Sequence, residues 1–144
     1  MISDMQNVEH LSRVISQATA PAFLLGAVAA FASILSVRMD KITDRSRALN
    51  AISDDDPARA RLKADIPRLV RRAVLIRRAI FLAVCSAIAS SGLLLFAFAS
   101  AFFQIAHEPG LALLFSVALL LLIGSLVSFA MELRISLNAL DHHA

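Results

Sequence analysis

Three stretches of apolar residues without a charged side chain run through this sequence, at residues 18–37, 79–103 and 111–131. An α-helix rises about 1.5 Å per residue and the hydrocarbon core of a bilayer is about 30 Å thick. Each stretch is therefore long enough to cross a bilayer as a helix. The pattern predicts an all-α membrane protein with three transmembrane helices.

Shorter polar segments flank these spans. In residues 1–17, apolar side chains recur at intervals of three and four, which predicts an amphipathic helix on the outer surface or leading into the membrane. The side chains concerned are Met5, Val8, Leu11 and Ile15. Pro21 is expected to begin the first buried helix or to kink it. Residues 104–110 are predicted to form an outer loop, and residues 132–144 a cytoplasmic tail.

Residues 38–78 are predicted to form a helical hairpin that extends the first two spans. Residues 53–57 read Ser-Asp-Asp-Asp-Pro, and a turn is expected there because aspartate favours an N-cap and proline a first helical position. Pro67 is expected to break the returning helix near Asp65. An apolar stripe continues from the first span into the hairpin through Leu35, Met39, Ile42, Leu49 and Ile52.

The returning helix carries an apolar seam with the alternating spacing of a heptad repeat, formed by Leu62, Ile66, Leu69, Ala73, Ile76 and Ile80. The same register continues into the second span through Ala83, Ala87, Ser90, Leu94, Ala97 and Ala101. Most of these residues are small, and small residues let helices approach closely in lipid. We therefore expect a tight three-helix bundle that packs through Ala22, Gly26, Ala30, Ala83, Ala87, Ser90, Gly124 and Ser128.

The basic residues predict the orientation of the chain. Of its 14 lysines and arginines, all but Arg13 and Arg134 lie in the hairpin, residues 38–78. The positive-inside rule places that hairpin in the cytoplasm, with the N-terminus outside and the C-terminus inside. With 58% hydrophobic residues in 144, the chain has no room for a separate soluble domain.

Three short motifs carry a family resemblance. Residues 21–25 read Pro-Ala-Phe-Leu-Leu, residues 38–49 carry the pattern Arg-x-x-Lys-Ile-x-Asp-Arg-x-Arg-Ala-Leu, and residues 77–80 read Arg-Arg-Ala-Ile. Together they resemble domain of unknown function 2721, a family of small bacterial inner-membrane proteins. Val37 and Lys41 depart from that pattern, which often has asparagine and arginine there. The resemblance implies a multi-pass protein of the bacterial inner membrane and implies no activity.

Several classes of function lack their usual residues. The spans contain no ionisable residue of the kind that marks transporters and proton relays. No histidine, cysteine or carboxylate spacing is typical of a metal site, and no catalytic motif or phosphate loop is present. Cys85, the single cysteine, lies inside the second span. We expect no enzyme activity, no cofactor and no metal.

The hairpin offers charged residues for anionic lipid headgroups or for a protein partner. They are Arg38, Lys41, Asp44, Arg45, Arg47, Arg71, Arg72, Arg77 and Arg78. On the first helix Asp40 and Asp44 are four residues apart, a spacing at which like charges repel. We therefore hypothesise that these aspartates pair with Arg71, Arg72 or Arg77 and hold the hairpin or an oligomer together. Nucleic acid binding is disfavoured, because the hairpin has no aromatic residue to stack on bases.

The function that these features favour is a non-enzymatic scaffold or accessory subunit that self-associates or binds a larger membrane partner. An alternative is a component of an oligomeric channel or transporter, with a pore lined by Ser33, Ser36, Ser86, Ser90 and Ser91. A membrane enzyme would need a polar cavity near Asp40, Asp44 and Arg47.

Overall fold

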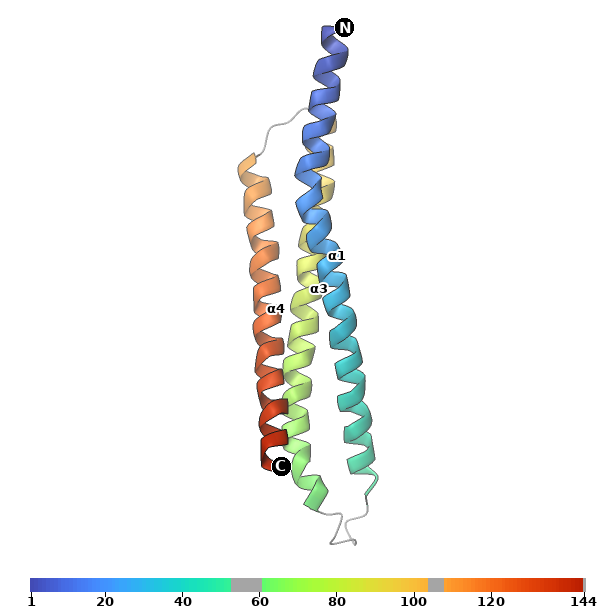
Figure 1. Ribbon diagram of the computed structural model, residues 1–144, viewed down its shortest axis with the longest axis vertical. Coiled ribbons are helices and arrows are strands. Elements are labelled where there is room, and N and C mark those ends of the chain that lie inside the picture. Colours follow the sequence, from blue (N-terminus) through green and yellow to red (C-terminus); the bar gives the residue numbers. More distant parts are fainter. Residues whose placement is uncertain (53–60, 104–107, 144) are drawn as a thin grey trace. The chain divides into compact units, whose positions relative to one another are not determined.

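The computed structural model describes residues 1–52, 61–103 and 108–143, and within these ranges the chain is helical with no strand. It forms three long helices, α1 (Ile2–Asn50), α3 (Ile66–Phe103) and α4 (Glu108–His143), shown in Figure 1. A short 3₁₀ helix, η1 (Arg61–Asp65), precedes α3. The all-α fold predicted from the apolar stretches is confirmed.

All three long helices contain a stretch that is long and apolar enough to cross a membrane. Large apolar side chains point outward on each of them: Phe23 is 76% exposed, Leu95 73% and Leu113 68%. A soluble monomer rarely exposes so much apolar surface, because water disfavours it. The composition and the exposed faces together fit a membrane protein.

Pro21 and Pro67 act differently because of where they lie in their helices. Pro21 lies inside α1, which continues from Ile2 through both the predicted outer helix and the first span. Pro67 is the second residue of α3, where its missing N–H would have no helical partner in any case. The helix break expected near Asp65 is found there, as the change from η1 to α3.

Several predicted segments lie partly or wholly beyond what the structure describes. The turn at residues 53–57 and residues 104–107 of the predicted outer loop lie outside the described residues. Residues 108–110 of that loop form the first turn of α4, and α4 also includes most of the predicted tail. The side chains of Leu62 and Ala101 are not among those described.

The helices contribute to two compact units. One unit consists of Met1–Ala30 and Ala83–Leu122, and the other of Phe31–Leu82 and Ile123–Ala144. We call them the first and second units. The core of the first unit includes Val28, Ala83, Ser86 and Ala118, and that of the second includes Leu35, Ile42, Ile76 and Ser125.

Burial along each helix follows a heptad repeat. On α1 every seventh residue is buried, at Pro21, Val28, Leu35, Ile42 and Leu49. On α3 one buried column is formed by Leu69, Ile76, Ala83 and Ser90. On α4 the buried residues seven apart are Ala118, Ser125 and Glu132. A seven-residue repeat keeps one face of a helix turned toward its neighbours over many turns.

The second column of the α3 seam lies one residue from the position predicted for it. Ala73, Ile80, Ala87 and Leu94 are only half-buried, whereas Ala79, Ser86 and Leu93, one residue earlier in each repeat, are buried. Two residues of the observed column make the hydrogen bonds to α4: the carbonyl oxygen of Ala79 accepts from Ser125, and Ser86 donates to the carbonyl oxygen of Ala118.

Hydroxyl groups set the register of α3 against α4 in each unit. In the second unit, Ser125 Oγ donates to the carbonyl oxygen of Ala79 at 2.6 Å. In the first unit, Ser86 Oγ donates to the carbonyl oxygen of Ala118 at 2.8 Å. Each unit thus has its own hydroxyl bond between α3 and α4.

Candidate functional site: a buried glutamate between two arginines

The polar centre of the second unit is a cluster of one carboxylate and two guanidinium groups, which we call the Glu132 cluster. Arg38 Nε donates to Glu132 Oε2 at 3.0 Å, and Arg38 Nη2 lies 2.8 Å from the same oxygen. Arg72 Nε donates to Glu132 Oε1 at 2.9 Å. Each residue comes from a different long helix, so the cluster joins α1, α3 and α4.

The heptad repeat places all three side chains of the cluster. Arg72 precedes the buried Ala79 by seven residues, and Glu132 follows the buried Ser125 by seven. The Arg72–Glu132 pair is therefore the next step of the register that pairs Ala79 with Ser125. Arg38 lies between the buried Leu35 and Ile42 of α1, at the spacing of a second inward-facing column.

Burial makes the pairing of Glu132 necessary. The side chain of Glu132 is 0% exposed, whereas those of Arg38 and Arg72 are 26% and 21% exposed. A carboxylate removed from water is strongly disfavoured unless it is paired and hydrogen-bonded. Here each of its two oxygens accepts a charge-assisted hydrogen bond from an arginine.

An aromatic ring also contacts Arg38. The Cζ atom of Arg38 lies 5.3 Å from the centre of the Phe129 ring, in cation–π geometry. Phe129 in turn packs edge-to-face against Phe31, with ring centres 5.4 Å apart. The guanidinium group of Arg38 thus contacts a carboxylate and a ring, both carried by α4.

The chemistry open to the cluster follows from these bonds. Both carboxylate oxygens already accept from guanidinium groups, and arginine stays protonated in proteins. Among the described residues, no group of three His, Cys, Asp or Glu side chains is placed to hold a metal ion. The arrangement is suited to holding helices together and to contacting an anion.

The charged residues that the sequence analysis selected separate into two groups. Arg38 and Arg72 belong to the cluster. The others are exposed: Lys41, Asp44, Arg45, Arg47, Arg71, Arg77 and Arg78. Asp40 is exposed as well. The carboxylate that contacts Arg72 is Glu132, rather than the Asp40 or Asp44 of the hypothesis.

The residues selected for helix packing also separate. Ala83, Ser90 and Ser128 are buried and Ala87 is half-buried. Gly124 lies against α3, since a Cβ atom added there would be 3.2 Å from Leu82 Cδ1. On α1, Ala22, Gly26 and Ala30 are exposed, and a Cβ added at Gly26 would meet no atom within 4 Å.

Glu132 is the site residue that sequence reasoning missed. The sequence pattern places it in the cytoplasmic tail, because it is the first charged residue after the third apolar stretch. The sequence does carry a signal for this residue. Glu132 lies seven residues after Ser125 and so on the same face of α4. Arg38 on α1 and Arg72 on α3 also lie at inward-facing spacings. A lone carboxylate at the edge of a span is a candidate partner for such arginines.

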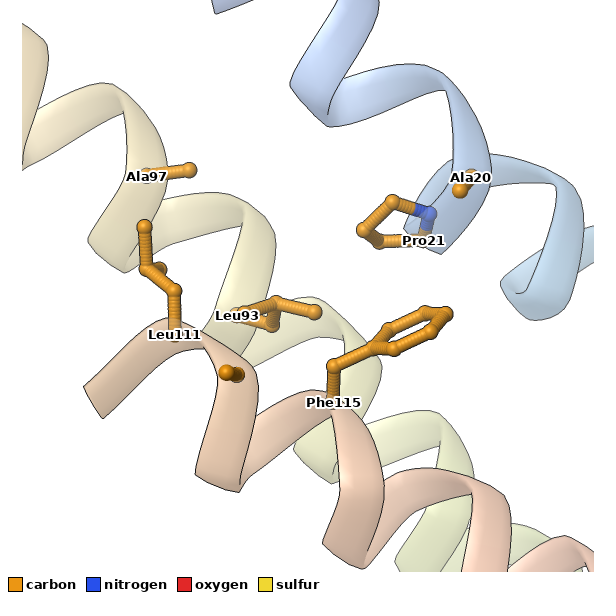
Figure 2. A pocket seen from close by; sticks show the side chains of 7 residues that line it. Ala20, Pro21, Leu93, Ala97, Leu111 and Phe115 are labelled. Atoms are coloured by element: carbon orange, nitrogen blue, oxygen red, sulfur yellow. The ribbon is translucent and has the colours of Figure 1, made fainter. Parts of the chain in front are cut away.

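An apolar pocket lies in the first unit, with a volume of about 420 Å³. Figure 2 shows the side chains of Pro21 of α1, Leu93 of α3 and Phe115 of α4 around it. Ala20, Ala97, Leu111 and Ala112 complete the lining. None of these side chains carries a hydrogen-bonding group, so the lining side chains favour an apolar occupant.

Comparisons with known proteins give one match. The model of a family described as "Protein of unknown function (DUF2721)" matches residues 18–142, most of the chain. No curated protein and no solved structure matches. The matched range includes all three residues of the Glu132 cluster.

Proposed function

This chain belongs to the DUF2721 family, and from that premise we propose that it is a non-enzymatic membrane scaffold or accessory subunit. It self-associates or binds a larger membrane partner, and its basic residues contact anionic lipid headgroups. We place it in the bacterial inner membrane, with the hairpin and C-terminus in the cytoplasm and the N-terminus outside. The distribution of charge supports the proposal, because almost all ionisable groups of the chain lie outside its three apolar stretches.

The Glu132 cluster is the observation that carries the proposal. Its one buried carboxylate binds two arginines of the same chain and joins three helices. A group used in this way supports a fixed structure, because breaking either pair leaves charge poorly compensated. Such a structure suits a protein that presents surfaces to other membrane components.

The exposed basic residues supply a surface for lipids or a partner. Lys41 and Arg45 lie one turn apart on α1, and Arg71 and Arg78 lie on α3 within the same unit. Basic residues near an anionic leaflet contribute about 1 kcal/mol each to membrane attraction. This surface favours the leaflet that is rich in anionic lipid.

The channel alternative receives less support from the serines that would line a pore. Ser36 donates to the carbonyl oxygen of Ala32, and Ser90 to that of Ser86. Ser86 donates across to α4, at Ala118. These hydroxyl groups take part in packing and in capping backbone carbonyls.

The proposal is tested by native mass spectrometry of the protein extracted from its own membrane. We expect a defined oligomer or one reproducible partner, and no solute flux when the purified protein is placed in liposomes. Gly26→Leu should reduce the assembled fraction, because it adds bulk to the exposed small-residue face of α1. Gly92→Leu is the matched control, since a Cβ at Gly92 also meets no atom within 4 Å.

A strictly monomeric protein without a partner would contradict the scaffold proposal. Conductance or flux from the purified protein alone would favour the channel instead.

A further inference from the structure

The geometry points to a binding site for a phosphate group on Arg38 and Arg72, with Glu132 as the positioning residue and the headgroup of an anionic membrane lipid as the ligand. The inference rests on the proposed membrane location. It goes further by naming two residues, a ligand class and a mechanism of positioning.

The charges of the cluster do not balance. Two guanidinium groups face one carboxylate, so the cluster retains one positive charge. Glu132 is fully buried, whereas both arginines keep about a quarter of their side-chain surface exposed. The excess positive charge is therefore available on the arginine side, where an anion can reach it.

The arginines also have hydrogen-bonding capacity beyond their bonds to Glu132. A guanidinium group carries five N–H donors in a planar fork that matches the oxygens of a phosphate. The hydrogen bonds to Glu132 use Nε of each arginine, and Nη2 of Arg38 lies against the same carboxylate. A phosphate bound by the outer edges of both groups would complete the neutralisation.

The two guanidinium groups are held in place before any ligand arrives. Glu132 accepts hydrogen bonds from both of them, and the Phe129 ring packs against the guanidinium group of Arg38. A flexible arginine loses rotamer freedom when it binds a ligand, and a pre-positioned one loses less. This distinguishes Arg38 and Arg72 from the exposed basic residues near them in the sequence, such as Lys41 and Arg71.

The position along the chain identifies the source of the phosphate. Arg38 directly follows the first apolar stretch, and Glu132 directly follows the third. Both residues thus stand at the depth where hydrocarbon gives way to headgroups. Asp40 lies two residues from Arg38 in the sequence, and its side chain is exposed. At that spacing the two side chains lie on different faces of α1.

The first test compares Arg72→Gln with Arg134→Gln, which remove the same charge from the cluster and from an exposed position on α4 outside the proposed lipid surface. Lipid retention is measured by native mass spectrometry, and affinity by binding to nanodiscs of phosphatidylcholine with and without phosphatidylglycerol. Arg72→Gln should weaken phosphatidylglycerol binding about tenfold or more, the size expected for losing a charged hydrogen bond. Arg134→Gln should change it less than about threefold, as expected for an exposed charge. Equal losses would overturn the inference, because they would indicate diffuse attraction.

Glu132→Gln gives the more discriminating result. It makes the cluster more positive, so charge alone would tighten phosphatidylglycerol binding. Loss of positioning would weaken binding despite the added charge, and that is the outcome we expect. Tighter binding would refute the role of Glu132. If this variant does not fold, as judged by circular dichroism and gel filtration, Arg38→Gln is compared with Arg134→Gln instead, with the same criterion as the first pair.

Inorganic phosphate separates the two sources of the ligand. For a lipid site, millimolar phosphate should leave phosphatidylglycerol bound. If phosphate displaces the lipid from the protein, and the Arg72→Gln variant does not show this displacement, the site binds free phosphate. That result would overturn the lipid assignment. The subunit count in the same spectra reports separately on the scaffold proposal, so either proposal can fail alone.

Discussion

Glu132 shows how one residue in a small helical protein takes its role from its partners. Charge and apolar pattern alone place it at the start of a solvated tail, yet its side chain is fully buried between Arg38 and Arg72. Two charge-assisted hydrogen bonds offset the loss of water. Among the described residues, no buried side-chain nitrogen or oxygen lacks a partner.

At this scale we predict that Glu132→Ala lowers the free energy of unfolding by about 3 kcal/mol. This value is at the low end for breaking a buried ion pair, because both arginines keep contact with solvent. Unfolding in a mild detergent, followed by circular dichroism, measures the change. Asp44→Ala is the control, because that exposed carboxylate should matter within about 0.5 kcal/mol. Equal effects of the two substitutions would mean that the Glu132 cluster contributes no stability.

At the scale of the helices, the contact between α3 and α4 combines close packing with hydroxyl bonds at a fixed interval. Ser125 bonds Ala79 in one unit and Ser86 bonds Ala118 in the other. Gly124 lets Leu82 approach closely beside the first of these bonds. Packing and hydrogen bonding take the place of the hydrophobic effect where lipid surrounds the helices.

Removing these hydroxyl groups should therefore weaken the contact measurably. Ser125→Ala and Ser86→Ala should each cost about 0.6–1.7 kcal/mol, the size measured for bonds between membrane helices. Ser116→Ala is a matched control, because Ser116 is exposed and bonds only the carbonyl of Ala112 in its own helix. Reversible unfolding in detergent measures all three. A loss for Ser116→Ala as large as for the other two would contradict the role of the interhelical bonds.

At the scale of the whole molecule, the distribution of charge predicts how the chain crosses a membrane. Almost all its basic residues lie between the first two apolar stretches, and basic loops stay in the cytoplasm. The fold itself does not depend on which side faces the cytoplasm. The orientation needs its own measurement.

In a Cys85→Ser background, we predict that Ala48→Cys reacts with an impermeant maleimide only after the membrane is opened. Ser3→Cys should react in intact spheroplasts, since the N-terminus is expected outside. Both positions are exposed, so a difference in labelling reports the side of the membrane. Labelling of Ala48→Cys from outside would reverse the predicted topology.

The features that followed from sequence are local ones. A run of apolar residues long enough to cross a bilayer must satisfy its backbone within the run, and a helix does so. Pro67 lacks an N–H and restricts the residue before it, so the change from η1 to α3 falls beside it. The family resemblance likewise rests on short motifs that can be read along the chain, and the family model matches residues 18–142.

The sequence by itself therefore determined the three helices, their apolar stretches, the break at Pro67 and one column of the α3 seam. Only the tertiary structure decided that Ala79 and Ser86, rather than Ile80 and Ala87, face α4, and that Glu132 lies inside. These outcomes depend on pairs far apart in sequence, such as Arg38 with Glu132, 94 residues away, and Arg72 with Glu132, 60 residues away. Helix formation is governed by hydrogen bonds between near neighbours, whereas the choice of buried face depends on which surfaces of distant segments fit together.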